Sequence, residues 1–248
     1  MLKTRKQYWS IVTNGFAYNE NVHEKLMSAK MTALTLSLDG LVDNHNWLRN
    51  HNLSFNKAID ALKLITNENN LNYDVVTCVN RRNINELVEL KKFLISKNVR
   101  AWRLFTISPI GRAKDNEKLV LQHAEINYLM NFIVETRNEG KIHTNFSCEA
   151  YTGKYEKYVR DNYFFCRAGV NIASVLIDGS ISACPNINRS FVQGNLYKDD
   201  LLEIWNSKFE IMRNRNWCKV GKCASCNDYK RCNGGAMHLW NENKKDIL

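Results

Sequence analysis

Short apolar runs alternate with amphipathic segments through the first 140 residues of the chain. Each run is rich in β-branched or aromatic residues and ends near Gly, Asn or Pro, which is typical of buried strands. The four predicted strands cover residues 8–15, 31–40, 73–80 and 100–109. Apolar residues at helical spacing between them predict helices over residues 21–30, 54–65 and 84–94. Strands that alternate with helices in this way indicate βαβ units and a parallel sheet.

The pattern changes after the fourth strand. A long helix over residues 124–139 follows it and is expected to end the alternation of strands and helices. Farther along, turn residues between short apolar segments predict a hairpin over residues 174–183. We therefore expect two domains, residues 1–145 and residues 146–248.

Polar residues and glycines collect where the predicted strands end, and ligands of parallel α/β proteins bind at that edge of the sheet. Residues of these types also make ordinary turns, so composition alone does not separate the two roles. The Asn- and His-rich segment before Ser54 is expected to be a loop, with Ser54 as the N-cap of the next helix. The strand-end residues are Thr13 to Gly15, Ser37, Asp39, Gly40, Thr77, Asn80, Arg103 and Ser108 to Gly111.

Composition narrows the class of protein. With 44% hydrophobic and 24% charged residues the chain is globular, and no apolar run approaches the roughly 20 residues of a membrane helix. The first residues lack the apolar stretch of a signal peptide, so we expect a cytoplasmic protein that does not bind membranes. The net charge of +10 comes from scattered Lys and Arg, which favours a solvated surface over nucleic-acid binding.

Six of the eight cysteines lie between residues 166 and 232. Cys223, Cys226 and Cys232 follow one another within ten residues among polar neighbours, which suits a soft metal or an iron–sulfur cluster better than a core. Structural zinc is the alternative, because C-x2-C pairs are common zinc ligands. Cys218 and Cys148 are possible additional ligands. Cys78 lies in an apolar strand and is expected to belong to the core.

The order of these cysteines and of the residues between them resembles the SPASM domain of radical S-adenosylmethionine (SAM) enzymes. The similarity covers C-x12-G-x4-C from Cys166 to Cys184, a Gly-Asn-Leu segment, a Leu-x2-Ile-Trp helix, and C-x2-C-x5-C-x-G-G from Cys223. The resemblance implies auxiliary [4Fe–4S] clusters, one on Cys166 and Cys184 and one on Cys223, Cys226 and Cys232, with Cys218 as a further ligand. The family pattern has another cysteine where this chain has Ala236.

The first half of the chain resembles the second half of a radical SAM barrel. The resemblance rests on Thr13-Asn-Gly15, Ser37-Leu-Asp-Gly40, His45-Asn46 with Arg49, Ser54-Phe55, and Arg103 with Pro109-Ile-Gly-Arg112. It implies that Thr13, Asn14, Ser37 and Arg49 contact SAM. The family's C-x3-C-x2-C motif, which holds the SAM-cleaving cluster, does not occur here. We therefore assign no catalytic residue and expect a fragment of a longer reading frame rather than a degenerate relative.

The expected fold class is α/β: a partial (β/α) barrel of parallel strands followed by a small cysteine-rich, SPASM-like α+β domain. The resemblance implies 5′-deoxyadenosyl-radical chemistry on a peptide or protein substrate, with a flavodoxin- or ferredoxin-type electron donor. The alternative is a non-catalytic module, stabilised by zinc or one cluster, that binds a peptide or partner protein. A basic nucleic-acid binder with a zinc knuckle is a weaker third hypothesis.

Overall fold

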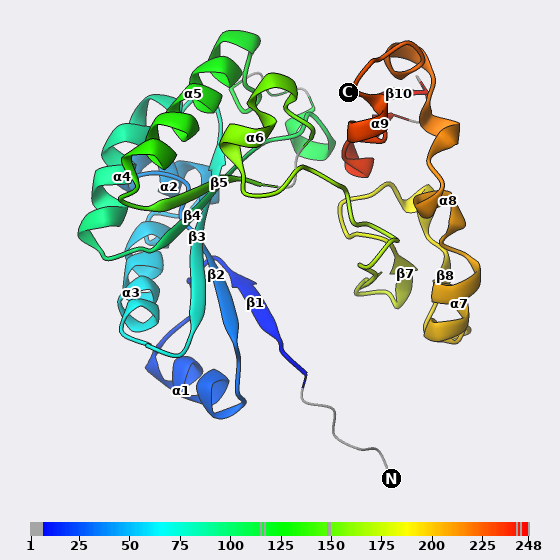
Figure 1. Cartoon of the computed structure of the whole chain (residues 1–248). Coiled ribbons are helices and arrows are strands. Elements are labelled where there is room, and N and C mark those ends of the chain that lie inside the picture. Colours follow the sequence, from blue (N-terminus) through cyan, green and yellow to red (C-terminus); the bar gives the residue numbers. More distant parts are fainter. Residues whose placement is uncertain are drawn as a thin grey trace. The chain divides into compact units, whose positions relative to one another are not determined.

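The chain divides into two compact units in a computed structural model (Figure 1). The structure describes residues 7–114, 116, 118–147, 150–241, 243 and 245–247. Unit 1 comprises residues 1–147 and 158–161, and unit 2 comprises residues 148–157 and 162–248. Each unit has its own core, so each is described by itself. None of the helices in the described ranges combines the length and apolar character that crossing a bilayer requires.

Unit 1 is built on a five-stranded sheet in the order β1-β2-β3-β4-β5. All neighbouring strands are parallel, which confirms the predicted partial (β/α) barrel. The strands are β1 (Ser10–Thr13), β2 (Ala33–Ser37), β3 (Asn72–Val79), β4 (Ala101–Thr106) and β5 (His143–Phe146). The prediction that the alternation ends after the long helix was wrong, because β5 continues it. This strand alternates buried Thr144 and Phe146 with polar residues, so it contains no apolar run.

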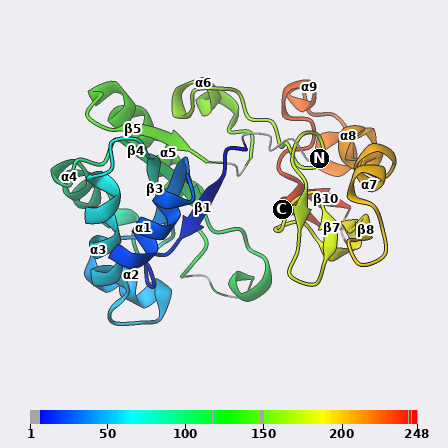
Figure 2. The ribbon, with the colours of Figure 1, turned by 90° about the horizontal axis from the view of Figure 1, so that it is seen from below.

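The helices of unit 1 cover one face of this sheet, as the views in Figures 1 and 2 show. They are α1 (Glu20–Ser28), α2 (Val42–Arg49), α3 (Ser54–Thr66), α4 (Leu87–Ser96) and α5 (His123–Glu139). The loop predicted before Ser54 was wrong, because α2 occupies it. Its sequence is polar and buries only His45, so no apolar stripe marks it. Ser54 is the first residue of α3 rather than its N-cap, which is Leu53.

The two faces of the sheet differ in polarity. On the helix-covered face, Trp102 of β4 is fully buried and its ring lies 5.8 Å from that of Phe132 in α5. On the other face, Arg103 of β4 and Thr35 of β2 both bond to the carboxylate of Asp74 in β3. This charged row crosses three adjacent strands on the concave side of the partial barrel.

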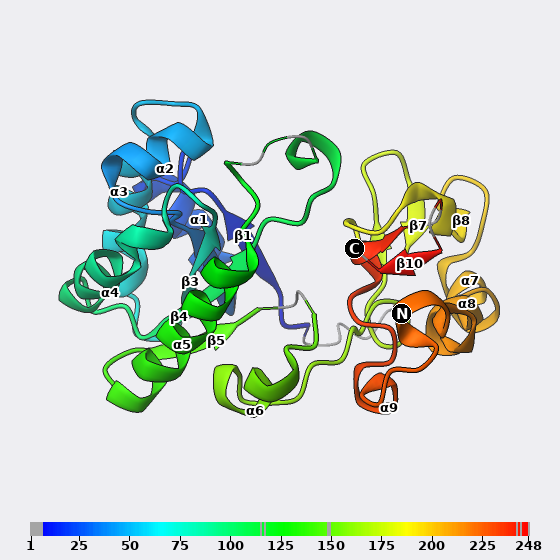
Figure 3. The ribbon, with the colours of Figure 1, turned by 90° about the horizontal axis from the view of Figure 1, so that it is seen from above.

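Unit 2 is a small α+β domain with a separate apolar core. Its strands are β6 (Ser174–Val175), β7 (Ser180–Ser182) and β8 (Gly194–Asn195), which form an antiparallel sheet, and β9 (Trp240–Asn241) and β10 (Asp246–Ile247), which form another. Its helices are α6 (Glu156–Val159), which begins in this unit, α7 (Leu201–Ser207), α8 (Glu210–Arg213) and α9 (Tyr229–Cys232). Figure 3 shows this unit from another side. The core packs Phe209 and Met212 against Ile181 of the hairpin.

The predicted hairpin and helix are confirmed in unit 2. Asp178 makes the turn between β6 and β7, because its carboxylate accepts a hydrogen bond from the backbone N–H of Ser180 at 3.1 Å. Asp200 caps α7 by accepting from the N–H groups of Leu202 and Glu203, both at 2.9 Å. The turn and the cap fix the two elements that stand between the early and late cysteines.

Candidate functional site

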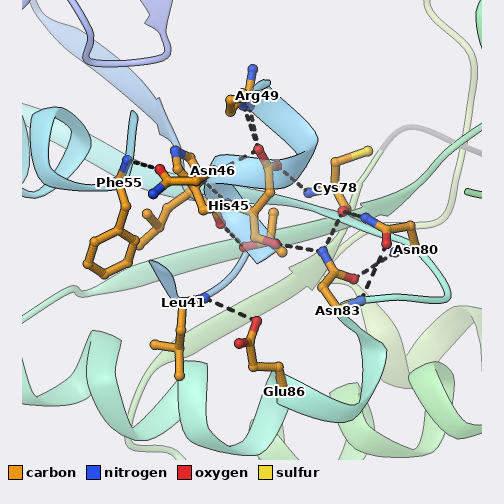
Figure 4. Close-up of polar contacts among 12 residues, drawn as sticks. Leu41, His45, Asn46, Arg49, Phe55, Cys78, Asn80, Asn83 and Glu86 are labelled. Carbon is orange, nitrogen blue, oxygen red and sulfur yellow. Dashed lines mark hydrogen bonds and ion pairs between the residues drawn. The ribbon is translucent and has the colours of Figure 1, made fainter. Parts of the chain in front are cut away.

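The buried carboxylate of Asp39 lies just beyond the end of β2 and bonds to residues of β3 and α2. Figure 4 labels two of these partners, Arg49 and Cys78. Oδ1 of Asp39 accepts a hydrogen bond from the backbone N–H of Cys78 in β3 at 2.9 Å. Its Oδ2 accepts from Nε and Nη2 of Arg49 in α2, both at 2.7 Å. Asp39 is 1% exposed, whereas the side chain of Arg49 is 31% exposed. The ion pair therefore fixes α2 against the ends of β2 and β3.

Two asparagines, Asn80 and Asn83, connect the end of β3 to the backbone of Asp39. The amide of Asn83 donates to the carbonyl of Asp39 at 2.6 Å and to that of Cys78 at 2.9 Å. The backbone N–H of Asn80 donates to Oδ1 of Asn83 at 2.8 Å. Sequence reasoning missed Asn83, although its spacing of three from Asn80 is typical of a side-chain-stabilised turn. Cys78 is half-buried rather than part of the core, because it lies on the open face of β3.

His45 of α2 is completely buried behind this network. Its Nδ1 accepts a hydrogen bond from the backbone N–H of Asp39 at 3.0 Å. Burial lowers the pKa of His45 from 6.5 to about 4, since a charged imidazole would lose its hydration; the carboxylate of Asp39 opposes this shift and Arg49 adds to it. The imidazole is therefore neutral at pH 7 and acts as an acceptor that holds the turn after β2.

The depressed pKa of His45 predicts acid sensitivity. Between pH 6.5 and about 4 the unfolded chain binds a proton that the folded chain does not, so stability falls as the pH falls through this window. We expect this group to account for a loss of up to about 3 kcal/mol in the free energy of unfolding. Chemical denaturation at several pH values should show that loss in the parent chain and not in His45→Asn, which keeps an acceptor.

His51 provides the matched control, because it is an exposed histidine whose Nδ1 also accepts a backbone N–H, from Leu53 at 3.1 Å. His51→Asn should leave the pH dependence unchanged. An equal pH dependence in the parent chain and in His45→Asn would contradict the assignment to His45.

Of the residues predicted to contact SAM, Arg49 belongs to this network, and the other three lie at or next to the ends of β1 and β2. Thr13 ends β1, and its hydroxyl accepts a hydrogen bond from the N–H of Gly15 at 3.1 Å. Asn14 is exposed, and its side chain accepts from the N–H of Phe16 at 3.0 Å. Ser37 ends β2 and is 9% exposed. The pairing of Thr13 with Leu36 brings Asn14 next to Ser37 at the same edge of the sheet, with Arg49 held nearby by Asp39.

The cysteines of unit 2 form two sets. Burial raises the pKa of the Cys184 thiol, and the nearby sulfur of Cys166 raises it further. Burial also raises the pKa of Cys232, with smaller increases from Cys223 and Cys226, while the backbone N–H groups of Gly235 and Gly234 lower it. The early set is therefore Cys166 and Cys184, and the late set includes Cys223, Cys226 and Cys232.

Tyr229 of α9 connects Cys218 to the late set. Its hydroxyl lies 3.5 Å from Cys218 Sγ. Its pKa is raised strongly, first by burial and then by Cys218, with added effects of Cys223 and Cys232. No disulfide joins the seven cysteines of the described ranges, and no three potential ligands converge to metal-binding distance there. Cys148 lies outside the described residues.

Comparisons with known proteins agree with both units. Residues 166–227 match the SPASM iron–sulfur cluster-binding domain. The solved structure of anSMEcpe with bound AdoMet and the Cp18Cys peptide has a TM-score of 0.71 at 19% identity and covers 97% of this chain and 69% of that one. Streptococcus suis SuiB bound to S-adenosylmethionine has a TM-score of 0.65 at 19% identity, over 96% and 58% of the two chains. The chain thus contains a SPASM domain match and shares the fold of these two SAM-binding proteins.

Curated relatives match this chain along most of its length. The AdoMet-dependent heme synthase of Methanosarcina barkeri is 22% identical over 246 residues, which is 90% of this chain and 68% of the synthase. The mycofactocin maturase MftC of Mycolicibacterium smegmatis is 24% identical over 249 residues, which is 94% of this chain and 63% of MftC. The chain thus spans roughly two thirds of these relatives.

The residues of the SPASM unit fit an iron–sulfur cluster. Cys166 adds to the increase in the pKa of Cys184, and Cys223 and Cys226 add to that of Cys232; a bound cation relieves such repulsion when thiols bind as thiolates. Gly234 leaves room for the sulfur of Cys218, because a methyl group there would lie 2.4 Å from it. The left-handed backbone of Gly234, with φ of +77°, also favours glycine.

Proposed function

We propose that this chain is part of a radical SAM/SPASM enzyme that modifies a peptide or protein substrate. The match of residues 166–227 to the SPASM domain carries the proposal. The mycofactocin maturase is a relative, and SuiB, which has the same fold, has been solved bound to its precursor peptide SuiA. These two proteins support a peptide as the substrate class.

The metal ligands in this proposal are the six cysteines of unit 2. Cys166 and Cys184 contribute to one [4Fe–4S] cluster, and Cys218 with Cys223, Cys226 and Cys232 would hold the other. A cluster at these positions supplies a one-electron acceptor or a site that orients the substrate. The alternative metal is zinc, which the same thiols would bind in tetrahedral geometry.

The SAM-binding residues in this proposal are Thr13, Asn14, Ser37 and Arg49. Bound SAM supplies the 5′-deoxyadenosyl radical when a cluster reduces it. In this chain, Ser37 and Asn14 offer polar groups at the strand ends, and Asp39 holds the guanidinium of Arg49 in place. The electron would come from a flavodoxin- or ferredoxin-type donor protein.

The second candidate function is a non-catalytic binding module, and the spacing of the cysteines favours it. None of the eight cysteines has the C-x3-C-x2-C spacing that holds the SAM-cleaving cluster. The chain would then be a non-catalytic module, stabilised by zinc or a cluster, that binds a peptide or partner protein.

Anaerobic reconstitution of the full chain separates these functions. We expect iron and sulfide in equal amounts, a brown colour, and heat on titration with SAM in a calorimeter. Without the C-x3-C-x2-C motif we expect no 5′-deoxyadenosine from this chain alone, even with dithionite. Stoichiometric zinc without sulfide, together with no heat on SAM addition, would instead support the binding module.

A further inference from the structure

Arg215 is a buried cation in unit 2. It is 2% exposed and is among the largest fully buried side chains. Nε donates to the carbonyl of Met212 at 2.9 Å, and Nη2 donates to the carbonyls of Cys166 at 2.7 Å and Ala168 at 3.3 Å. The ring of Phe165 lies 5.6 Å from the guanidinium carbon. Every one of these partners is uncharged.

The charge of Arg215 has no counter-charge in the described part of the chain. No carboxylate there pairs with it, and Nη1, which is also buried, has no hydrogen-bond partner. By contrast, the half-buried Arg49 in unit 1 is paired with Asp39 at 2.7 Å. A buried guanidinium without an anion is strongly unfavourable. A negatively charged group near Arg215 would therefore be stabilising, and the side chains of the described residues do not supply one.

Arg215 also lies between the two sets of cysteines. Its side chain reaches the backbone of Cys166, the first residue of the early set. Its own carbonyl accepts hydrogen bonds from the hydroxyl of Tyr229 at 2.7 Å and from the thiol of Cys218 at 2.9 Å, beside the late set. The guanidinium of Arg215 thus lies near the cysteines that would be negatively charged thiolates when they bind a cluster.

We propose that Arg215 is the internal counter-charge of the iron–sulfur cluster bound by Cys166 and Cys184, and that it raises the reduction potential of that cluster. This rests on the proposed function. Each cysteine thiolate that binds a [4Fe–4S]²⁺ core adds a negative charge, and one-electron reduction adds another. A nearby buried cation stabilises the reduced form more than the oxidised form, because net charge and hydrogen bonding set cluster potentials.

The test compares neutral and charged replacements in the reconstituted full chain. Dithionite reduces each cluster by one electron. At each solution potential, absorbance and electron paramagnetic resonance measure the fraction of cluster that is reduced. In Arg215→Met we expect the ratio of reduced to oxidised cluster at a fixed potential to fall at least tenfold, which corresponds to about 59 mV for a one-electron couple. Arg215→Lys keeps the charge and should stay within threefold of the parent chain.

Arg213→Met is the matched control, because it removes a positive charge two residues away. Arg213 is only half-buried, and it bonds the carbonyls of Gly169 and Trp205. The Arg213→Met variant should keep the reduction potential of the parent chain. The melting temperature gives a second measurement: the increase on reconstitution should be smaller in Arg215→Met than in the parent chain, whereas a purely structural arginine would destabilise the metal-free and loaded chains equally.

The outcomes separate the hypotheses. If Arg215→Met and Arg215→Gln cannot assemble the cluster while Arg215→Lys can, the need for charge is supported. A cluster in Arg215→Met with the parent potential, or equal losses in the Met and Lys variants, would overturn the counter-charge. A parent chain that binds no iron and sulfide would overturn the proposed function itself, and the counter-charge with it.

Discussion

Replacing Cys232 by serine is expected to remove about four iron atoms per chain, the content of one [4Fe–4S] cluster. Burial raises the pKa of Cys232 most, and Cys223 and Cys226 raise it further, so the sulfur of Cys232 lies near both of theirs. A serine hydroxyl is a poor ligand for iron that thiolates bind well. The early set, Cys166 and Cys184, should keep its own iron. Iron and sulfide analysis after anaerobic reconstitution measures the loss.

Cys78→Ser is the control for that experiment. Cys78 lies in β3 of unit 1, outside both sets, and its replacement should leave the iron content unchanged. If Cys232→Ser retains all the iron, or if both variants lose the same amount, the late set does not hold a cluster. Loss of one zinc per chain in place of iron and sulfide would identify the structural metal instead.

Strong local patterns made most of the fold predictable. The strands β1 to β4 are apolar runs that end in turns, and α3 and α5 carry buried residues at helical spacing. Elements without such a pattern were missed. The short helix α2 buries a single histidine, and Asn and His do not favour a helix by themselves. Its contacts with α3 and with the strand ends stabilise it, and tertiary contacts cannot be inferred from local sequence.

The candidate site was predictable only where spacing carries the chemistry. The late cysteine set was predicted as a metal site because C-x2-C-x5-C brings three thiols together within ten residues. The network around Asp39 joins residues that are far apart in sequence, since Asn83 lies 44 positions away. Arg215 reaches back 49 positions to Cys166. No sequence pattern distinguished it from the many exposed basic residues, and only its burial identifies it.

The second large effect is expected for Asp39→Asn, which should lower the free energy of unfolding by about 3 kcal/mol. An asparagine at this position carries no charge and has only one acceptor oxygen. It cannot accept both from the N–H of Cys78 and from the two donors of Arg49. The NH₂ group of the new asparagine would point at these hydrogen-bond donors and could not bond to them. The side chain of Arg49 is 31% exposed, so in this variant it can turn toward water. The expected loss in the free energy of unfolding is therefore at the lower end of the range for broken buried ion pairs.

Asp60→Asn provides the matched comparison, because Asp60 pairs with Lys63 at 3.0 Å on the surface of α3, with both side chains more than 60% exposed. Its loss should stay below about 1 kcal/mol, since water and salt screen exposed pairs. Chemical denaturation of both variants measures the difference. Similar small losses in the two variants would mean that Asp39 does not hold α2 in place. A large loss confined to Asp39→Asn would show that the strand-end edge of unit 1 depends on one buried carboxylate.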